Sequence, residues 1–374
     1  MSNDEIQIPV VSIVPGIGDA VRNKLSSMTA SFPAAKLYQC SKLKIVDIPT
    51  PFVCPLNANK DKSIAMTTPE WKLDLKQQQI LEHAEILLMD AHLAAPMLLA
   101  PKTNLPADLQ HLLKKVKWVQ GTYTGVDSYL QYPNTPVDPS FTVSRAGGTM
   151  SKALAQFVFG HVIAIERKLS EAKQYQEKRV FARWDLTYRS YRQVTIGILG
   201  LGEVGQEIGR MFKTSGFQVV GLKRRVSKGD RKALLLSADC VSTNLNEVLE
   251  QSDYVVNVLP STRTTRYLLT EKTLELCRKK QPVFINVGRG DIIAERTIIA
   301  AIDKGLLSKA VLDVFEQEPL PKESLLWSHP KVIVTPHIAG AVFPDDVADV
   351  FVRNLDRYIE GEPVLYRMDW SKGY

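Results

Sequence analysis

The sequence has few cysteines, and their spacing excludes several kinds of site. The four cysteines, Cys40, Cys54, Cys240 and Cys277, form no CxxC pair. Two disulfides are possible by count, but free thiols in a reducing compartment are favoured, because a chain of this length can bury a core without covalent staples. We expect no metal site.

The chain also lacks targeting and membrane signals. No apolar run reaches the ~18 residues that a membrane-spanning helix requires. The N-terminal stretch MSNDEIQIPVVSIVPG is acidic and lacks the basic and apolar regions of a signal peptide. We therefore expect a cytoplasmic protein without a membrane partner.

A long basic block is absent as well, although the formal net charge is +7. The 47 Lys and Arg residues are spread along the chain among 40 Asp and Glu residues. Scattered charge argues against a nucleic-acid partner, whereas a local positive site for an anionic ligand is compatible with it.

The chain does contain alternating strand and helix patterns. At ~150 residues per domain, 374 residues suggest two domains. In the first third, apolar runs predict strands at 9–14, 84–90 and 116–121. Apolar residues spaced by three and four predict helices at 70–84 and 107–116. This part of the sequence indicates a small α/β unit.

The second part of the chain is more regular. After a proline-rich stretch at 132–140, which predicts a loop, residues 151–176 have the pattern of one long helix joining two domains. From residue 194 onward, six apolar runs alternate with turns and helices, which indicates a doubly wound parallel sheet. The runs are VTIGILG, FQVVGL, YVVNVLP, PVFINVG, AVLDVF and VIVTPH. A last helix at 345–362 is expected to return to the first domain.

Three glycines follow the first of these runs. Gly200, Gly202 and Gly205 form GxGxxG between a strand and a helix. The first permits a tight turn, the second lets the backbone approach a pyrophosphate, and the third allows close packing of helix on strand. The helix N-terminus adds amide donors and a positive dipole. An ordinary glycine-rich turn is the alternative, but the flanking elements favour a dinucleotide site.

An acidic residue is missing where an NAD site would have one. About 20 residues past such a motif, a carboxylate accepts hydrogen bonds from the ribose of NAD. Here the second strand ends in Lys223, Arg224 and Arg225. Arginine binds phosphate oxygens with paired donors and lysine adds a compact charge, so NADP, and NADPH over NADH, is favoured. The alternative is a solvated basic turn.

Three polar residues follow successive strands near the end of the second domain. Arg289 follows PVFINV, Glu318 follows AVLDVF, and His337 follows VIVT. Ligands bind beyond the carboxyl ends of parallel strands, so these side chains are expected on the side of the glycine turn. His337 can give a proton to an alkoxide, Glu318 can orient and support the imidazole, and Arg289 can hold a carboxylate. Together they indicate reduction of a 2-keto acid, although each alone would more often be structural or exposed.

These stretches resemble a known family. GILGLGEVG, NVGRGDII, LDVFEQEPLP and VTPHIAG have the order and spacing of the D-isomer-specific 2-hydroxyacid dehydrogenases, and the resemblance extends from about residue 118 to the C-terminus. EPLPKESLLWSHPKVIVTPHIAG and WSKGY resemble the glyoxylate/hydroxypyruvate reductase A branch.

The resemblance implies an α/β fold with two Rossmann-like domains. A flavodoxin-like substrate-binding domain would span 1–146, completed by 342–374, with a doubly wound NADP-binding Rossmann domain at 147–341 inserted into it. A homodimer would form through the inserted domain, with 151–176 and 181–192 at the dimer contact and the hinge.

The resemblance also assigns residues. The active-site arginine, glutamate and histidine fall on Arg289, Glu318 and His337, and the nicotinamide-carboxamide aspartate falls on Asp313. The other residues that the motif and the resemblance place against the dinucleotide are Met150, Gly200, Gly202, Glu203, Val204, Gly205, Lys223, Arg224, Arg225, Leu259, Pro260, Thr265, Val287 and Gly288.

The substrate loop of the family has a glycine before an aspartate, and its backbone amides hold the substrate carboxylate. Here the loop reads TYTGVD, which places Tyr123, Thr124 and Gly125 at that site. A tyrosine is bulkier than the residue often found there, which bears on the size of the substrate. Trp327 fits either a wall of the substrate pocket or core packing.

We therefore expect NADPH-dependent reduction of small 2-keto acids, such as glyoxylate and hydroxypyruvate, with His337 as proton donor. One alternative is an NAD-linked 2-hydroxyacid dehydrogenase working in the oxidative direction. Another is a dinucleotide-sensing corepressor that keeps the dehydrogenase fold, although the sequence has no nuclear-type basic run.

Overall fold

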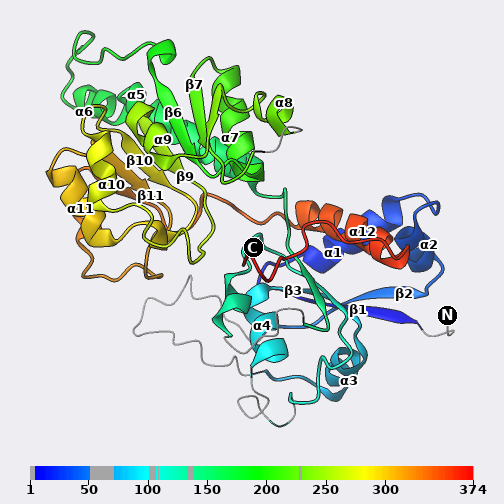
Figure 1. The fold of residues 1–374 in the computed structure, drawn as a ribbon. Coiled ribbons are helices and arrows are strands. Elements are labelled where there is room, and N and C mark those ends of the chain that lie inside the picture. Colours follow the sequence, from blue (N-terminus) through cyan, green and yellow to red (C-terminus); the bar gives the residue numbers. More distant parts are fainter. Residues whose placement is uncertain are drawn as a thin grey trace. The chain divides into compact units, whose positions relative to one another are not determined.

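The computed structural model describes residues 5–50, 71–100, 107, 109–132, 139–226 and 230–373. The chain forms two compact units (Figure 1). Unit 1 comprises Met1–Thr149 and Val342–Tyr374, and unit 2 comprises Met150–Ala341. Most of the expected loop at 132–140 lies outside the described residues, as does Cys54.

Unit 1 contains a parallel sheet, which has five strands within the described residues. The strands are β1 (Ile6–Val11), β2 (Leu43–Asp47), β3 (Ile86–Met89), β4 (Trp118–Gln120) and β5 (Thr142–Ser144). Their order, β2-β1-β3-β4-β5, is that of flavodoxin-like sheets. The strand predicted at 9–14 lies earlier, because its pairing with β2 begins at Ile6 opposite Leu43.

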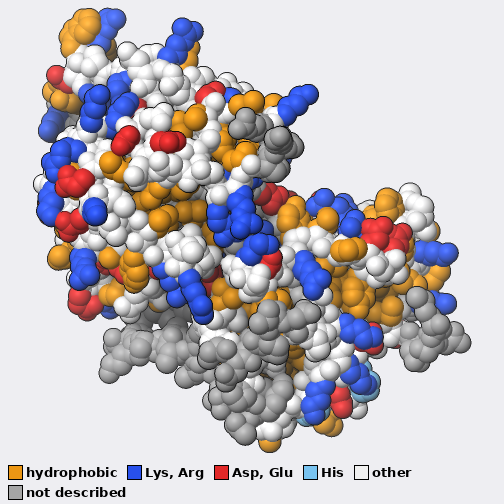
Figure 2. All heavy atoms as spheres, viewed as in Figure 1, with side chains coloured by type: hydrophobic (Ala, Val, Ile, Leu, Met, Phe, Trp, Pro, Cys, Tyr) orange, Lys and Arg blue, Asp and Glu red, His pale blue; other side chains and the backbone are white. Residues whose placement is uncertain are grey.

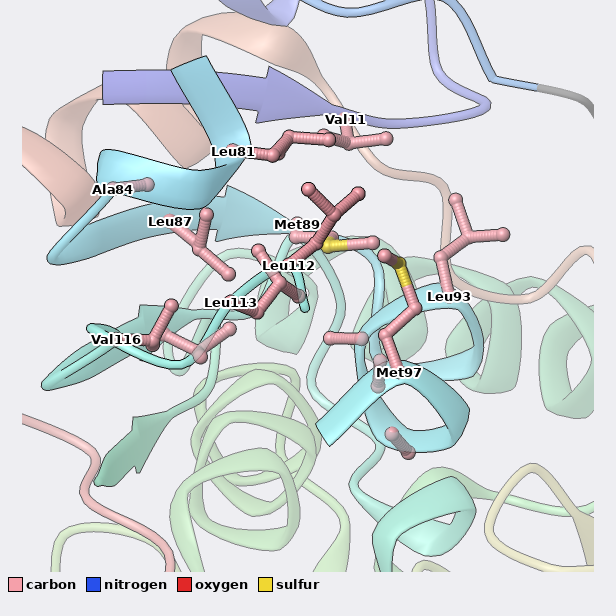
Figure 3. Close-up of a cluster of buried hydrophobic side chains, with 14 of the residues drawn as sticks. Val11, Leu81, Ala84, Leu87, Met89, Leu93, Met97, Leu112, Leu113 and Val116 are labelled. Carbon is pink, nitrogen blue, oxygen red and sulfur yellow. The ribbon is translucent and has the colours of Figure 1, made fainter. Parts of the chain in front are cut away.

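A buried apolar cluster packs on one face of this sheet, against α3 (Leu75–His83) and α4 (Ala91–Leu99). Figure 3 shows Leu87 and Met89 of β3 directed toward Met97 of α4 and Leu112. Helix α3 begins later than the predicted 70–84, because Asp74 and Gln77 form a capping box at its N-terminus.

The helix predicted at 107–116 is wrong. Within this stretch the described residues form turns, and Leu113 has a φ of 58°, a left-handed conformation that an α-helix cannot contain. Leu109 and Leu112 are nevertheless buried in the cluster of Figure 3. The apolar spacing therefore reported burial rather than helical structure.

The last helix, α12 (Pro344–Ile359), belongs to unit 1, where it lies beside α1 (Ile17–Ser27) (Figure 1). Its Asn354 is fully buried and donates from Nδ2 to Gln120 Oε1 at 2.8 Å. The amide of Leu365 donates to Asn354 Oδ1 at 2.7 Å. These bonds hold the C-terminal part of the chain on β4.

Unit 2 contains a second parallel sheet, which has seven strands within the described residues. They are β6 (Thr195–Leu199), β7 (Gln218–Leu222), β8 (Cys240–Ser242), β9 (Tyr254–Asn257), β10 (Val283–Asn286), β11 (Lys309–Leu312) and β12 (Val332–Val334). The order β12-β11-β10-β9-β6-β7-β8 is the doubly wound Rossmann order with one added edge strand. The predicted fold class is confirmed. The sequence pattern missed β8, a short edge strand with little apolar content.

The prediction of one helix at 151–176 is wrong, because two helices occupy it. Helix α5 (Ser151–Glu166) ends before Lys168, whose φ of 49° starts a new helix, α6 (Leu169–Glu177). Helix α5 packs on α7 (Glu203–Thr214).

The other described helices are α2 (Pro33–Gln39), α8 (Asp230–Leu234), α9 (Leu245–Gln251), α10 (Glu271–Leu274) and α11 (Glu295–Asp303). Short 3-10 helices are η3 (Asp127–Gln131), η4 (Tyr191–Gln193), η5 (Glu275–Cys277), η6 (Gly290–Ile292) and η7 (Leu325–Trp327).

The surface carries both signs of charge. On the face shown in Figure 2, Lys and Arg side chains lie among Asp and Glu side chains, with hydrophobic side chains between them. In the described ranges, every helix is too short or too polar to cross a bilayer. The same ranges contain no group of three or more His, Cys, Asp or Glu side chains arranged to hold a metal ion.

Candidate active site

The glycine motif forms the turn between β6 and α7. Gly200 has a φ of 106°, which favours glycine. A Cβ on Gly205 would lie 2.0 Å from the carbonyl oxygen of Gly200, so only glycine lets the helix approach the turn this closely. A Cβ on Gly202 would meet no atom within 4 Å, so the backbone there is open to a ligand. With Glu203 and Val204 opening α7, the turn fits the pyrophosphate of a dinucleotide.

The basic segment begins at the end of β7, directly beside this turn. The carbonyl oxygen of Leu222 accepts hydrogen bonds from Gly200 N at 3.2 Å and Leu201 N at 2.9 Å. The next residue, Lys223, is half-buried, and Arg224 and Arg225 are exposed. Three cations therefore follow the strand whose end is bonded to the glycine turn.

Two buried asparagines, which the sequence pattern does not identify as site residues, hold the neighbouring loops. Asn257 ends β9 and donates to Asn286 Oδ1 at the end of β10, at 2.8 Å. Asn286 accepts from Gly288 N at 3.2 Å and donates to the carbonyl oxygen of Arg289 at 3.0 Å. The only sequence signal for Asn257 and Asn286 is that each is a polar residue at the end of an apolar run. The pair fixes the backbone that carries Arg289.

Leu259 connects the glycine turn with the loop after β10. A Cβ on Gly200 would lie 3.0 Å from Leu259 Cδ2, and a Cβ on Gly288 would lie 2.9 Å from the Leu259 carbonyl oxygen. The carbonyl oxygen of Pro260 accepts from Thr265 Oγ1 at 2.6 Å. The structure thus brings together the expected residues that follow β6, β9 and β10.

Glu318 and His337 form a hydrogen-bonded pair. His337 Nδ1 lies 2.7 Å from Glu318 Oε2, and the amide of Phe315 donates to Glu318 Oε1 at 2.9 Å. The carboxylate is therefore held through both oxygens. Since Nδ1 faces Glu318, Nε2 is the imidazole nitrogen that remains for a substrate, and the His337 side chain is 54% exposed.

The two pKa values are shifted in opposite directions. The pKa of His337 is raised, first by its hydrogen bond to Glu318, against the opposing effect of burial. Burial raises the pKa of Glu318, but the hydrogen bond and charge of His337, the Phe315 amide and the charge of Arg289 together bring it below its usual value. The Arg289 charge also lowers the pKa of His337, so it acts on both members of the pair. The three expected catalytic side chains are close enough to form one electrostatic unit.

Asp313 holds the segment that carries His337. Its buried carboxylate accepts from Thr335 Oγ1 at 2.7 Å, from Ile338 N at 2.8 Å and from Ala339 N at 2.9 Å. The His337 amide donates to the carbonyl oxygen of Asp313 at 3.0 Å. The residue that the resemblance assigns to the nicotinamide carboxamide thus also fixes the loop that carries His337.

The remaining expected residues of unit 2 differ in burial. Met150 is buried, and its Sδ lies 3.3 Å from the position of a Cβ on Gly340. Val287 is also buried. Trp327 is 54% exposed and donates from its indole to the carbonyl oxygen of Pro321 at 2.9 Å. This exposure contradicts the core-packing alternative for Trp327, and its place in a substrate pocket stays a prediction.

Tyr123, Thr124 and Gly125 belong to unit 1. They form the loop after β4, at the carboxyl end of that sheet, and each is half-buried. The carbonyl oxygen of Tyr123 accepts from Ala146 N at 3.0 Å. The loop is therefore a separate feature from the residues gathered in unit 2.

Comparison with known proteins decides the family. Residues 159–339 match the D-isomer specific 2-hydroxyacid dehydrogenase, NAD binding domain. The chain is also 30% identical, over 266 residues, to a glyoxylate/hydroxypyruvate reductase A of Salmonella newport (strain SL254), a match that covers 70% of this chain and 83% of the relative. The chain belongs to the D-isomer-specific 2-hydroxyacid dehydrogenase family. It is an NAD(P)-dependent enzyme of that family, similar to its glyoxylate/hydroxypyruvate reductase A members.

Solved structures of other dehydrogenases of this family agree with the fold. A family protein from Aeromonas salmonicida subsp. salmonicida A449 has a TM-score of 0.72 and 29% identity, covering 98% of this chain and 100% of that one. A second, from Xanthobacter autotrophicus Py2 in complex with NADPH and MES, has a TM-score of 0.71 and 26% identity, covering 99% and 100%.

Removing the Glu318 carboxylate tests the electrostatics of the pair. Because the hydrogen bond to Glu318 is the largest cause of the raised pKa of His337, Glu318→Gln should lower that pKa. An NMR titration measures the pKa of His337, with the signals of its imidazole assigned by their absence in His337→Gln. Glu323→Gln, an exposed change in the same region, should leave the pKa in place. A His337 pKa that stays at the wild-type value in Glu318→Gln would show that another group sets it.

Proposed function

We propose that the enzyme reduces small 2-keto acids, such as glyoxylate and hydroxypyruvate, to 2-hydroxy acids with NADPH. The observation that carries the proposal is the Glu318–His337 pair at 2.7 Å, with the charge of Arg289 beside it. The glycine turn follows β6 of the same parallel sheet, whose carboxyl edge is where such folds bind ligands. The name of the Salmonella relative supports these two substrates.

The roles follow from the chemistry of the three groups. When bound, NADPH supplies the hydride that adds to the carbonyl carbon of the keto acid. His337, protonated and held at Nδ1 by Glu318, gives the Nε2 proton to the carbonyl oxygen as it becomes a hydroxyl. Arg289 binds the substrate carboxylate with its paired donors and stabilises negative charge on the adjacent oxygen. His337 is left neutral and takes a proton from solvent.

Cofactor preference is proposed from the basic segment. In an NAD site this position holds an acidic residue that binds the ribose and would repel a 2′-phosphate. In this chain the position is occupied by Lys223, Arg224 and Arg225. Arg225 forms no ion pair with any described carboxylate, so its guanidinium remains available for a phosphate. The Xanthobacter structure, which contains NADPH, supports the same preference.

A homodimer through unit 2 is proposed from the segment at 181–192. Phe181 is 94% exposed and Trp184 is 78% exposed, which is unusual for large apolar side chains of a folded protein. The segment is nonetheless anchored, because Arg189 bonds to Glu166 and, at 2.8 Å, to Asp253. A fixed segment that displays aromatic side chains suits contact with a second copy.

The catalytic proposal is tested by His337→Gln. We expect kcat for glyoxylate with NADPH to fall by about 100-fold or more, since general acid catalysis contributes roughly that factor. The dissociation constant for NADPH should stay within about twofold of the wild-type value, as His337 lies outside the phosphate turn. The control, His83→Gln, changes an exposed histidine of unit 1 and should leave kcat unaffected.

Two results would redirect the assignment. Absence of turnover by the wild type on a panel of 2-keto acids, with intact NADPH binding, would favour the dinucleotide sensor. Faster oxidation of 2-hydroxy acids with NAD than reduction with NADPH would favour the NAD-linked dehydrogenase.

The basic segment is tested by the double change Arg224→Ala and Arg225→Ala. Loss of both guanidinium groups should raise the KM for NADPH by about tenfold or more, because each arginine–phosphate contact is charge-assisted. The KM for NADH should change by less than about twofold, as NADH has no 2′-phosphate. Lys232→Ala removes an exposed charge from the same unit and serves as control. Equal effects on both cofactors would contradict the assignment.

The dimer is tested by light scattering after gel filtration. The wild type should have the mass of two chains, and Phe181→Ser combined with Trp184→Ser should shift it toward one chain, because the change removes apolar contact area. Phe32→Ser alters an exposed aromatic of unit 1 and should not change the mass. A wild-type monomer at micromolar concentration would refute the dimer.

A further inference from the structure

A buried carboxylate in unit 1 has no role in the chemistry described above. Asp90 follows β3 directly and is 0% exposed. Its Oδ1 accepts from Ser12 Oγ at 2.7 Å and from Thr122 Oγ1, and its Oδ2 accepts from Ile13 N at 2.8 Å. All three donors come from two loops that are distant from Asp90 in the sequence.

The strand order explains why one side chain reaches both loops. In the sheet of unit 1, β3 lies between β1 and β4. Ser12 and Ile13 follow β1, and Thr122 follows β4. Asp90 therefore stands at the centre of the carboxyl edge, the edge at which open α/β sheets bind their ligands.

Burial of this carboxylate has an energetic consequence. Removing a charged side chain from water is unfavourable unless hydrogen bonds or an opposite charge offset the lost hydration. Within the described residues no Lys or Arg forms an ion pair with Asp90, so the three donors supply the hydrogen bonds that offset the loss, and the nearby His92 interacts electrostatically with the carboxylate. An apolar side chain would fill the place at lower cost, but it would not fix the two loops.

The loop after β4 is the one that the proposed function assigns to the substrate. It is tied at Gly121, whose amide donates to the carbonyl oxygen of Ser144 at 2.7 Å, and at Thr122, through Asp90. In the described part of the chain, the amides of Gly125 and Val126 donate to no other group. The loop is thus held at its start, while the amide of the half-buried Gly125 stays available for an anion.

We infer that Asp90 is a positioning residue, which acts through Thr122 to hold the loop of Tyr123, Thr124 and Gly125 in the conformation that binds the substrate carboxylate. The inference rests on the proposed function, because it presumes that a keto acid binds this loop. Asp90 itself touches no substrate, since it is fully buried.

The test separates the effect of the Thr122 hydrogen bond from that of the other donors to Asp90. Thr122→Val removes the hydroxyl at nearly constant volume, and Thr122→Ser keeps it. Thr122→Val should raise the KM for glyoxylate by about tenfold, as expected for loss of a hydrogen bond to a charged group, with the KM for NADPH unchanged. Thr122→Ser should restore the KM to within about twofold. Ser12→Ala is the matched control, because it removes a donor to the same Asp90 oxygen from the other loop, and it should change the KM for glyoxylate by less than about threefold.

A second measurement is independent of turnover. Hydrogen–deuterium exchange of a peptide covering 121–126 should be faster in Thr122→Val than in the wild type or Thr122→Ser, with peptides of unit 2 unchanged. If the wild type reduces no keto acid, the proposed function fails, and this exchange still tests the tie. Unchanged exchange in Thr122→Val would overturn the inference. Faster exchange with an unchanged KM for glyoxylate, or equal KM effects of Thr122→Val and Ser12→Ala, would overturn it as well.

Discussion

The proposed chemistry depends on one hydrogen bond, between the carboxylate of Glu318 and Nδ1 of His337. The bond engages Nδ1, so Nε2 is the nitrogen that would face a substrate, and it raises the pKa of the imidazole, which favours the protonated form that the proposed mechanism needs. Arg289 opposes that shift with its own charge, and in the proposed mechanism the same guanidinium binds the substrate carboxylate. The pair therefore works only while the Glu318 carboxylate stays ionised, and the lowered pKa of Glu318 maintains that state.

In both units a buried carboxylate holds loops at the carboxyl edge of the parallel sheet. In unit 2, the buried Asp313 follows β11 and holds the segment that carries His337. In unit 1, the buried Asp90 follows β3 and holds the loops on either side. A carboxylate placed at the carboxyl end of an interior strand can reach the loop that follows a neighbouring strand. Asp313 and Asp90 each fix loop backbone between strands. Without these bonds, that backbone would lack the regular hydrogen bonds of a sheet or helix.

The features that could be predicted are those with a local signature. The glycine turn and the strand rhythm revealed the fold, and the meeting of strand ends predicted that Glu318 and His337 converge. Other features lack such a signature. The break at Lys168 has no glycine or proline, and the apolar spacing at 107–116 is the same for a buried set of turns as for a helix. Asn286 was missed because its role arises from a partner in another loop.

The most direct test of the central claim is the pH dependence of kcat/KM for glyoxylate with NADPH, in the wild type and in Glu318→Gln. If Glu318 keeps His337 protonated for the reaction, the rate of reduction falls as the pH rises through the His337 pKa, and this basic limb lies at lower pH in the variant. A basic limb at the same pH in both enzymes would contradict the account.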